Sequence, residues 1–166
     1  MTSAQAITIR PLHPTQDLPA VTAFLIEAAD YALLADGHAP GPTAAADFFT
    51  DTPPGCDPAM SHRLGLFHDS HLSGLAELSF GFPEPTSAYL GLLILAPRVR
   101  GLGFGPIVLT HVETLARAAG ALHLYLAVLE VNLRGASFWE RHGFRYTGLS
   151  GTNGAGRRLH RLVKPL

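Results

Sequence analysis

The stretch Arg98-Val99-Arg100-Gly101-Leu102-Gly103-Phe104-Gly105-Pro106 decides how this chain folds. It follows the apolar run Ser87 to Leu95, which has the length and composition of a central strand covered on both faces. After it comes a helical stripe of apolar residues that ends at Gly120. A strand, a glycine-rich turn and a helix N-terminus bring unpaired backbone N–H groups and the positive end of a helix dipole together. The stretch therefore predicts a phosphate-binding turn, to which Arg98 and Arg100 add positive charge.

The glycine spacing does not by itself identify the phosphate ligand. A P-loop ends in Gly-Lys-Ser or Gly-Lys-Thr, whereas Gly105-Pro106-Ile107 offers neither the lysine nor the hydroxyl, so that class is excluded. A dinucleotide fingerprint needs glycines at its first, third and sixth positions; Gly101 and Gly103 fit, but the sixth residue is Pro106. Glu130 lies at a plausible spacing for a ribose contact, so an NAD(P)-binding oxidoreductase stays open, as does a turn that binds nothing.

Strand-like and helix-like patterns extend outward on both sides of this turn. Strands are predicted over residues 8–10, 62–68, 72–80, 87–95, 122–128, 144–150 and 157–163. Helices are predicted after the capping residue Asp17, from Ala44 to Phe49, from Pro106 to Gly120, and from Asn132 to Gly143. The sequence thus predicts one mixed α/β domain over residues 1–166, with a sheet of about seven strands flanked by about four helices.

The composition indicates which classes of partner and which cellular compartment to expect. Twelve Lys and Arg against thirteen Asp and Glu give a net charge of −1, which attracts neither nucleic acid nor an anionic membrane and favours a small ligand. One cysteine and nine scattered histidines give no disulfide framework and no zinc pattern, so no metal is expected. The N-terminus lacks a signal-peptide pattern, which favours the cytoplasm. The hydrophobic share of 47% is high enough to suggest a homodimer contact.

Three segments resemble the GNAT acetyltransferases. Arg98-x-x-Gly101-x-Gly103, extended by Gly105, resembles the family's acyl-CoA pyrophosphate loop and follows an apolar strand as it does there. Ile9-Arg10-Pro11-Leu12 with Asp17-Leu18-Pro19 is similar to the family's opening, and residues 132–144 resemble its N-x-x-A-x-x-L-Y-x-x-x-G-F helix. The resemblance implies a mostly antiparallel sheet and an N-acetyltransferase that transfers an acetyl group from acetyl-CoA to a primary amine of a small molecule not identified by the sequence.

The same resemblance implies which residues hold the cosubstrate. The backbone of Leu93, Ile94 and Leu95 would pair with pantetheine, although these residues also fit a core strand. Asn132 would contact the pantetheine arm, although it also fits a simple helix cap. The pyrophosphate would be held around Arg98, Val99, Arg100, Gly101, Leu102, Gly103, Phe104 and Gly105, and Trp139 is placed with the cofactor-binding residues.

The catalytic residues are less evident, because the sequence departs from the family twice. An alkyl ammonium with a pKa of about 10.4 is neutral only about once in a thousand molecules at pH 7, so a base is needed more than an acid. The family's acid tyrosine falls on Trp139, and the activating glutamate of the protein N-terminal acetylases falls on Ala127. Glu77 is the best remaining base, and Tyr125 is a candidate acid or substrate contact; a solvated carboxylate and a packing role are the competing interpretations. The two departures also leave open an acyl-CoA-binding regulatory module with little turnover.

Overall fold

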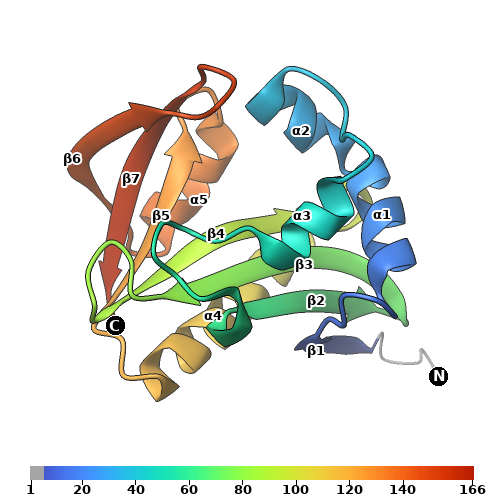
Figure 1. Ribbon diagram of the computed structural model, residues 1–166, viewed down its shortest axis with the longest axis horizontal. Helices are drawn as coiled ribbons and strands as arrows, with labels where there is room; N and C mark the ends of the chain where they lie inside the picture. Colours follow the sequence, from blue (N-terminus) through green and yellow to red (C-terminus); the bar gives the residue numbers. More distant parts are fainter. Residues whose placement is uncertain (1–5) are drawn as a thin grey trace.

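The computed structural model describes residues 6–166, which form a seven-stranded sheet in the order β1-β2-β3-β4-β5-β7-β6 (Figure 1). Every neighbouring pair is antiparallel except β4 and β5, which are parallel. The predicted mixed, mostly antiparallel sheet is therefore confirmed. The strands are β1 (Ile7–Pro11), β2 (His62–His68), β3 (His71–Phe80), β4 (Ser87–Leu95), β5 (His123–Leu129), β6 (Arg145–Thr152) and β7 (Arg158–Pro165).

Five α-helices lie within the described residues, one more than the sequence predicted. They are α1 (Leu18–Glu27), α2 (Ala29–Asp36), α3 (Ala44–Thr50), α4 (Phe104–Ala118) and α5 (Leu133–Arg141). The missed helix is α2, which follows α1 after Ala28 alone and ends at Gly37 in the left-handed conformation. Its two leucines, Leu33 and Leu34, are exposed while Ala35 is buried, so no apolar stripe marks it. No single helix in this part of the chain is long and apolar enough to cross a membrane. Helices α1 and α2, which meet at a bend of 70°, would together reach the length and apolar composition of a membrane span.

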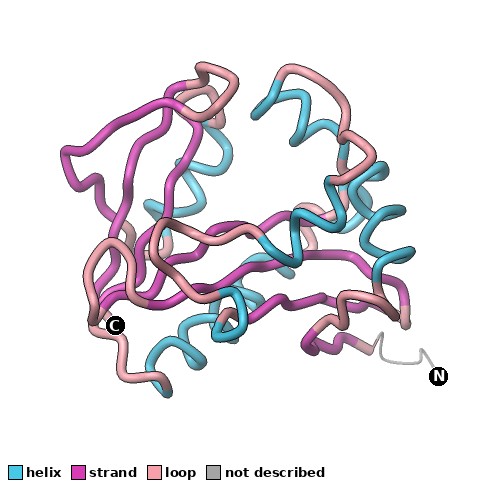
Figure 2. Tube along the Cα trace, viewed as in Figure 1, coloured by secondary structure: helices cyan, strands magenta, loops and turns pink. Residues whose placement is uncertain are grey.

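The helices cover both faces of the sheet (Figures 1 and 2). In these views α1 and α3 lie in front of β3, whereas α4 lies behind it and α5 stands beside β5. Strand β3 is buried along nearly its whole length, and its buried residues include the polar Ser73, Glu77 and Ser79 on one face. Helix α4 buries its predicted stripe against the sheet, with Val108, Val112 and Ala116 at most 3% exposed.

Asp17 precedes α1, as predicted, but its side chain does not cap the helix. Its carboxylate instead accepts hydrogen bonds from Arg10 Nη2 at 2.8 Å and Arg10 Nη1 at 3.0 Å, and from the His13 backbone N–H at 2.6 Å. The hydrogen bond from Arg10 lowers the pKa of Asp17 to about 2. The prediction that the Asp17 side chain caps α1 is therefore wrong. Its carboxylate binds the Arg10 guanidinium, a charged donor, in place of the first backbone N–H groups of the helix.

The parallel pair β4 and β5 is short, and this shapes the middle of the molecule. The two strands pair only where Ser87, Ala88 and Tyr89 face His123, Leu124 and Tyr125. Beyond that point they diverge, β4 running to the right and β5 upward in Figure 1. A bulge at Gly91 lies just past the divergence, since Glu77 pairs with Leu92 and Leu78 with Leu90. The far half of β4 therefore has one edge without a partner strand.

Candidate active site

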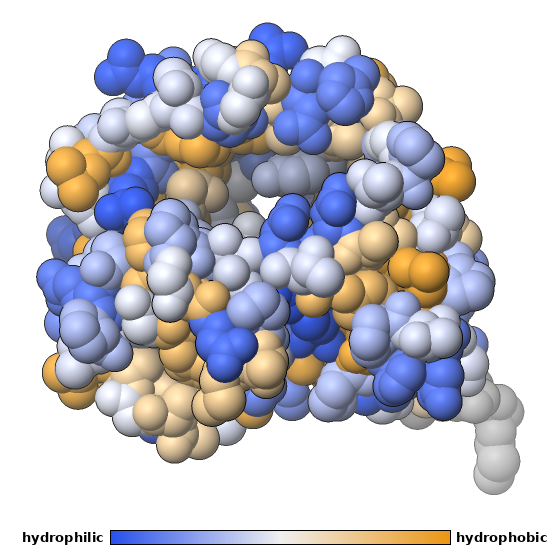
Figure 3. All heavy atoms as spheres, viewed as in Figure 1, coloured by the Kyte–Doolittle hydropathy of each residue, from blue (hydrophilic) through white to orange (hydrophobic). Residues whose placement is uncertain are grey.

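The gap between the diverging strands is a cleft with a volume of about 580 Å³. Space-filling atoms show the molecule hollowed at this place, at the centre of the face in Figure 3. The cleft is bounded by the free edge of β4, the turn after it, the start of α4 and one face of α5. Its lining residues are Asp30, Tyr31, Leu34, Leu93, Ile94, Leu95, Arg100, Gly101, Gly103, Phe104, Gly105, Pro106, Asn132, Arg134, Gly135, Phe138, Trp139, Arg141 and His142.

The glycine-rich turn presents main chain to this cleft. Gly101 and Gly103 have φ of +77° and +85°, and a Cβ atom on either one would meet open space within 4 Å. Gly103 is the N-cap of α4 and has no side chain to cap it, so the first N–H groups of the helix have no intrahelical partner. Positive φ and close approach by a ligand are the two reasons for glycine at these positions. The turn therefore has the main-chain geometry that an anion site requires.

The two arginines of the turn are engaged with acidic residues of α1 and α2. Arg98 donates from Nε to Glu27 at 2.7 Å and from Nη2 to the Leu72 carbonyl at 2.9 Å, and it does not line the cleft. Arg100 lines the cleft, forms an ion pair with Asp30 and donates from Nε to the Leu95 carbonyl at 3.1 Å. The positive charge that the sequence assigned to a phosphate is thus offset within the protein, and both arginines fasten α1 and α2 to the turn.

Most of the other predicted cofactor residues lie in the same cleft. Leu93, Ile94, Leu95, Phe104, Gly105 and Trp139 line it, whereas Val99 is buried beneath the turn and Leu102 is exposed outside it. Asn132 both lines the cleft and caps α5, since its Oδ1 accepts from the Gly135 N–H at 2.9 Å. The sequence missed the contribution of α2, namely Asp30, Tyr31 and Leu34, because no pattern marked that helix.

A second cavity, with a volume of about 480 Å³, adjoins the first. Tyr31 and Ile94 line both, so the two cavities meet at these side chains. The other residues of the second cavity come from α1, α2, α3, β2, β3 and β4 and from the connections between them. They are Leu25, Ala32, Asp36, His38, Pro40, Gly41, Thr43, Ala44, Asp47, Phe48, Asp51, Arg63, Glu77, Gly91 and Leu92.

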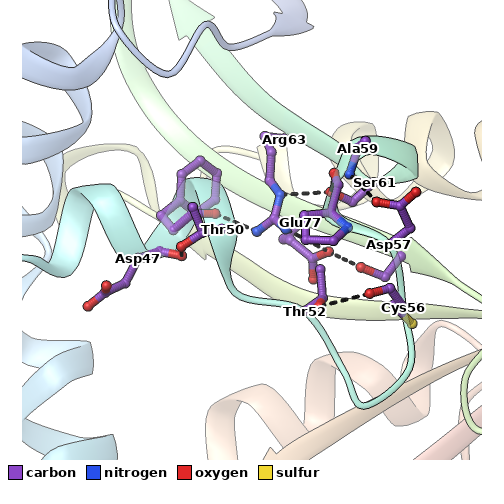
Figure 4. Close-up of polar contacts among 12 residues, drawn as sticks. Asp47, Thr50, Thr52, Cys56, Asp57, Ala59, Ser61, Arg63 and Glu77 are labelled. Carbon is purple, nitrogen blue, oxygen red and sulfur yellow. Dashed lines mark hydrogen bonds and ion pairs between the residues drawn. The ribbon is translucent and has the colours of Figure 1, made fainter.

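Glu77 is the buried carboxylate of the second cavity, 4% exposed and mid-strand on β3. Its neighbour across the sheet is Arg63, whose Nη2 lies 3.9 Å from Glu77 Oε1, and Ser79 donates its hydroxyl to the same oxygen (Figure 4). Burial raises the pKa of Glu77, and the hydrogen bond from Ser79, the charge of Arg63 and the Gly91 N–H offset part of that rise. Glu77 is therefore a carboxylate inside a cavity with an increased affinity for a proton.

The Glu77 carboxylate lies directly beside the bulge in β4. A Cβ atom on Gly91 would come within 2.0 Å of Glu77 Oε2. Only glycine leaves room at this point for the carboxylate to lie against the neighbouring strand. The bulge just past the β4–β5 pairing thus makes space for the candidate base.

Arg63 connects Glu77 to the segment that closes the second cavity. The side chain is 8% exposed; Nε donates to Ser61 Oγ at 2.9 Å and Nη1 donates to the Phe48 carbonyl at the end of α3 (Figure 4). Burial lowers the pKa of Arg63, and Glu77 and Asp51 partly counter this. One guanidinium therefore fixes both α3 and the loop before β2 next to Glu77.

Three further acidic residues, Asp36, Asp47 and Asp51, line the second cavity together with Glu77 and are exposed. The cationic side chain among its lining residues is Arg63, which is already bonded to Phe48 and Ser61. Within residues 6–166 no group of three or more His, Cys, Asp or Glu side chains is placed to hold a metal ion. The cavity carries an excess of negative groups that are spread around it.

Tyr125 lies at the end of the short parallel pairing, directly beside Tyr89 of β4. It lines neither cavity. Ala127, two residues further along β5, is exposed. Of the two predicted catalytic residues, Glu77 therefore lines a cavity and Tyr125 does not.

Comparisons with known proteins agree with this architecture. The profile of the acetyltransferase (GNAT) family matches residues 28–144 of the chain. Over 81 residues the chain is 33% identical to a streptothricin acetyltransferase from Streptomyces lavendulae, a match that covers 49% of this chain and 42% of that protein. Since the profile covers well over half of the residues, the chain belongs to the GNAT family of acyltransferases.

Two solved structures share the fold. An acetyltransferase from Thermus thermophilus superposes with a TM-score of 0.73 at 24% identity and covers 97% of both chains. The PaiA N-acetyltransferase from Thermoplasma acidophilum, crystallised with coenzyme A, has a TM-score of 0.71 at 21% identity and covers 97% of this chain and 99% of that one. At these identities the likeness establishes the fold alone.

Proposed function

We propose that the protein is an N-acetyltransferase that transfers the acetyl group of acetyl-CoA to a primary amine of a small molecule. The observation that carries this proposal is the junction of two cavities at Tyr31 and Ile94. The first has main-chain donors suited to a pyrophosphate, and the second contains a buried carboxylate suited to accept a proton.

The first cavity fits CoA by its chemistry. The free edge of β4 at Leu93, Ile94 and Leu95 offers backbone groups to the amides of pantetheine, as a neighbouring strand would. The N–H groups from Gly101 to Gly105 and the start of α4 would hold the pyrophosphate. Asn132 lies on the opposite wall, where its amide nitrogen is available to the pantetheine arm.

Glu77 would act as the general base. Holding an amine of pKa about 10.4 in its neutral form at pH 7 requires about 4 to 5 kcal/mol. In the reaction Glu77 first takes a proton from the bound ammonium and releases it to solvent. The neutral nitrogen then bonds to the acetyl carbon, the carbon–sulfur bond breaks with its electrons on sulfur, and Glu77 takes the second proton from nitrogen. A buried carboxylate with a raised pKa is matched to that task, directly or through one water.

The second cavity supports a small, positively charged acceptor. Its volume of about 480 Å³ suits a small molecule, and its carboxylates favour an ammonium over an anion. The similarity to a streptothricin acetyltransferase supports a small-molecule amine as the acceptor class. The homodimer and the cytoplasmic location stay predictions; light scattering at micromolar concentration tests the first.

The test is incubation with acetyl-CoA and a broad panel of small amines, with release of the CoA thiol as the readout, together with calorimetry of CoA binding. We expect micromolar CoA affinity and a rate increase with at least one amine. Tight CoA binding without turnover for any amine would instead favour a regulatory CoA-binding module. Binding of NAD(P) without binding of CoA would favour an oxidoreductase.

A further inference from the structure

Tyr31 is the polar side chain at the junction of the two cavities. The residues shared by both linings are Tyr31 and Ile94, and Ile94 has no side-chain group that can donate a hydrogen bond. An acyl group that passes from the first cavity to the second must cross this junction. The Tyr31 phenol is therefore a side-chain hydrogen-bond donor shared by the linings of both cavities.

Helix α2 holds Tyr31 in this position from both ends. Asp30, the preceding residue, is ion-paired with Arg100 of the glycine-rich turn. At the other end the Ala35 carbonyl accepts a hydrogen bond of 2.8 Å from Asn153 Nδ2 in the β6–β7 connection. Figure 1 shows α2 lying across the gap from that connection. A side chain on a helix fixed at both ends is preorganised rather than carried on a mobile loop.

The Tyr31 hydroxyl is free to bind a ligand. Among residues 6–166 it has no hydrogen-bond partner, and the side chain is half-buried where it lines the two cavities. Burial raises the pKa of Tyr31, and the charge of Asp36 and the neighbouring Tyr89 raise it further. The phenol therefore stays protonated at neutral pH and acts as a donor.

A hydrogen-bond donor at the departing sulfur of CoA would stabilise the thiolate that forms there. The tyrosine to which the family resemblance points is replaced by Trp139, which packs edge-on against Phe138 and Phe144 on the far wall of the first cavity. The indole N–H is a donor as well, but its ring is engaged in this aromatic cluster. Tyr31 approaches the junction from the opposite wall, on α2.

We propose that Tyr31 is a catalytic residue that donates its hydroxyl hydrogen bond to the CoA sulfur as the carbon–sulfur bond breaks. The inference rests on the proposed function and assigns a second residue to that reaction. Sulfur keeps the electron pair of the broken bond and leaves as a thiolate bonded to the Tyr31 hydroxyl, while the proton lost by the amine goes to Glu77. Tyr31 keeps its own proton, because a phenol is a weaker acid than a thiol with a pKa of about 8.5.

The test is the Tyr31→Phe variant, which removes one oxygen and keeps the ring. Since hydrogen bonds to charged groups are the strong ones, we expect kcat to fall about 10- to 100-fold while the affinity for acetyl-CoA stays within about twofold. Titration of the bound CoA thiol, followed by ultraviolet absorbance, gives a readout independent of turnover. Its pKa should be about one unit higher in the Tyr31→Phe complex than in the wild-type complex.

Tyr146→Phe is the matched control, because Tyr146 lies on the exposed edge strand β6 and bonds to Ser150 outside both cavities. It should change neither kcat nor the thiol titration. An unchanged thiol titration and kcat in folded Tyr31→Phe would overturn the assignment. Because the titration needs only bound CoA, it decides the role of Tyr31 even if no acceptor amine is found; failure of wild-type protein to bind CoA would overturn both proposals.

Discussion

The two adjoining cavities are built from different parts of the polypeptide. The part of the cleft beside β4 that is proposed to hold CoA is main chain: a free strand edge, two glycines with positive φ and the start of α4. Side chains such as Phe138 and Trp139 line the rest of it. The cavity around Glu77 is formed by side chains from six elements and the loops between them. Main-chain sites depend on a local sequence pattern, whereas side-chain sites depend on which distant segments the fold brings together.

The polarity of the two regions differs as well. The first offers N–H donors and a helix N-terminus to an anion, and the second offers carboxylates to a cation. Changes in the first should therefore act on CoA affinity, and changes in the second on the transfer rate. The following experiments test that division, in order of decreasing expected effect on transfer. The last variant is expected to affect stability alone.

Glu77→Gln should have the largest effect. Because the amide cannot accept the amine's proton, we expect kcat to fall about 100-fold or more, with CoA affinity within about twofold of wild type. Steady-state kinetics and calorimetry measure the two quantities. Glu84→Gln, an exposed carboxylate on the β3–β4 connection, should change neither. A comparable loss of CoA affinity in Glu77→Gln would show that the two regions are not separable.

The pH profile of the wild-type enzyme should carry the same signature. A base must be deprotonated, so kcat/KM should fall as the pH drops through the pKa of Glu77, which burial raises above the ordinary value of 4.5. This acid limb should be absent from the residual activity of Glu77→Gln. An acid limb that persists unchanged in the variant would assign it to another group.

Gly103→Val tests the main-chain region. The substituted residue must adopt a φ of +85° and would project into the space proposed for the pyrophosphate, so we expect CoA affinity at least about tenfold weaker, or about 1.4 kcal/mol. Gly120→Val is the matched control at the other end of α4, with a φ of +82° and equally open space. Calorimetry should show a loss of affinity only at residue 103, although both variants lose stability. Equal affinities would remove the phosphate site from the turn.

Gly91→Ala tests the contact between the two regions. The new methyl group would displace the Glu77 carboxylate, and we expect kcat to fall about fivefold, roughly 1 kcal/mol, with little change in CoA affinity. Gly151→Ala, with open space around it on β6, serves as the control. Transfer at the wild-type rate in Gly91→Ala would mean that the position of Glu77 does not matter.

Asp17→Asn should leave transfer unchanged and lower stability. The folded-state pKa of Asp17 is depressed to about 2, so its contribution is present above its unfolded value of 3.8 and is lost as the pH falls towards 2. We expect a loss of about 1 to 2 kcal/mol at pH 7, narrowing below about pH 4. Denaturant unfolding at several pH values measures this. A constant difference at all pH values would exclude the ion pair as its source.

The difference between the two regions also explains what the sequence could predict. The strand Ser87–Leu95 and the turn after it carry their own pattern, so the sheet and the glycine loop were predicted closely. Glu77 was found because it is a carboxylate in the middle of a strand, on the polar face next to the strand expected to bind the cosubstrate. In both cases the informative residues are neighbours in the sequence.

The rest depends on contacts between distant residues. The partners of Arg98 and Arg100, Glu27 and Asp30, lie about 70 positions away, and no local pattern links them. Helix α2 has no apolar stripe because its surroundings are two cavities rather than a continuous core. Its residue Tyr31 was missed for that reason.

The short pairing of β4 with β5 divides the sheet into two parts. These two parts (panels), β1–β4 and β5–β7, are joined along three residue pairs, and α2 contacts both sides of the opening between them through Asp30 and Ala35. A molecule whose amides bond along the free edge of β4 would fill the place of a missing strand and fasten the panels together. Binding of the cosubstrate would then stabilise the fold, and amide hydrogens of β4 and β5 should exchange more slowly once the cleft between the two strands is occupied.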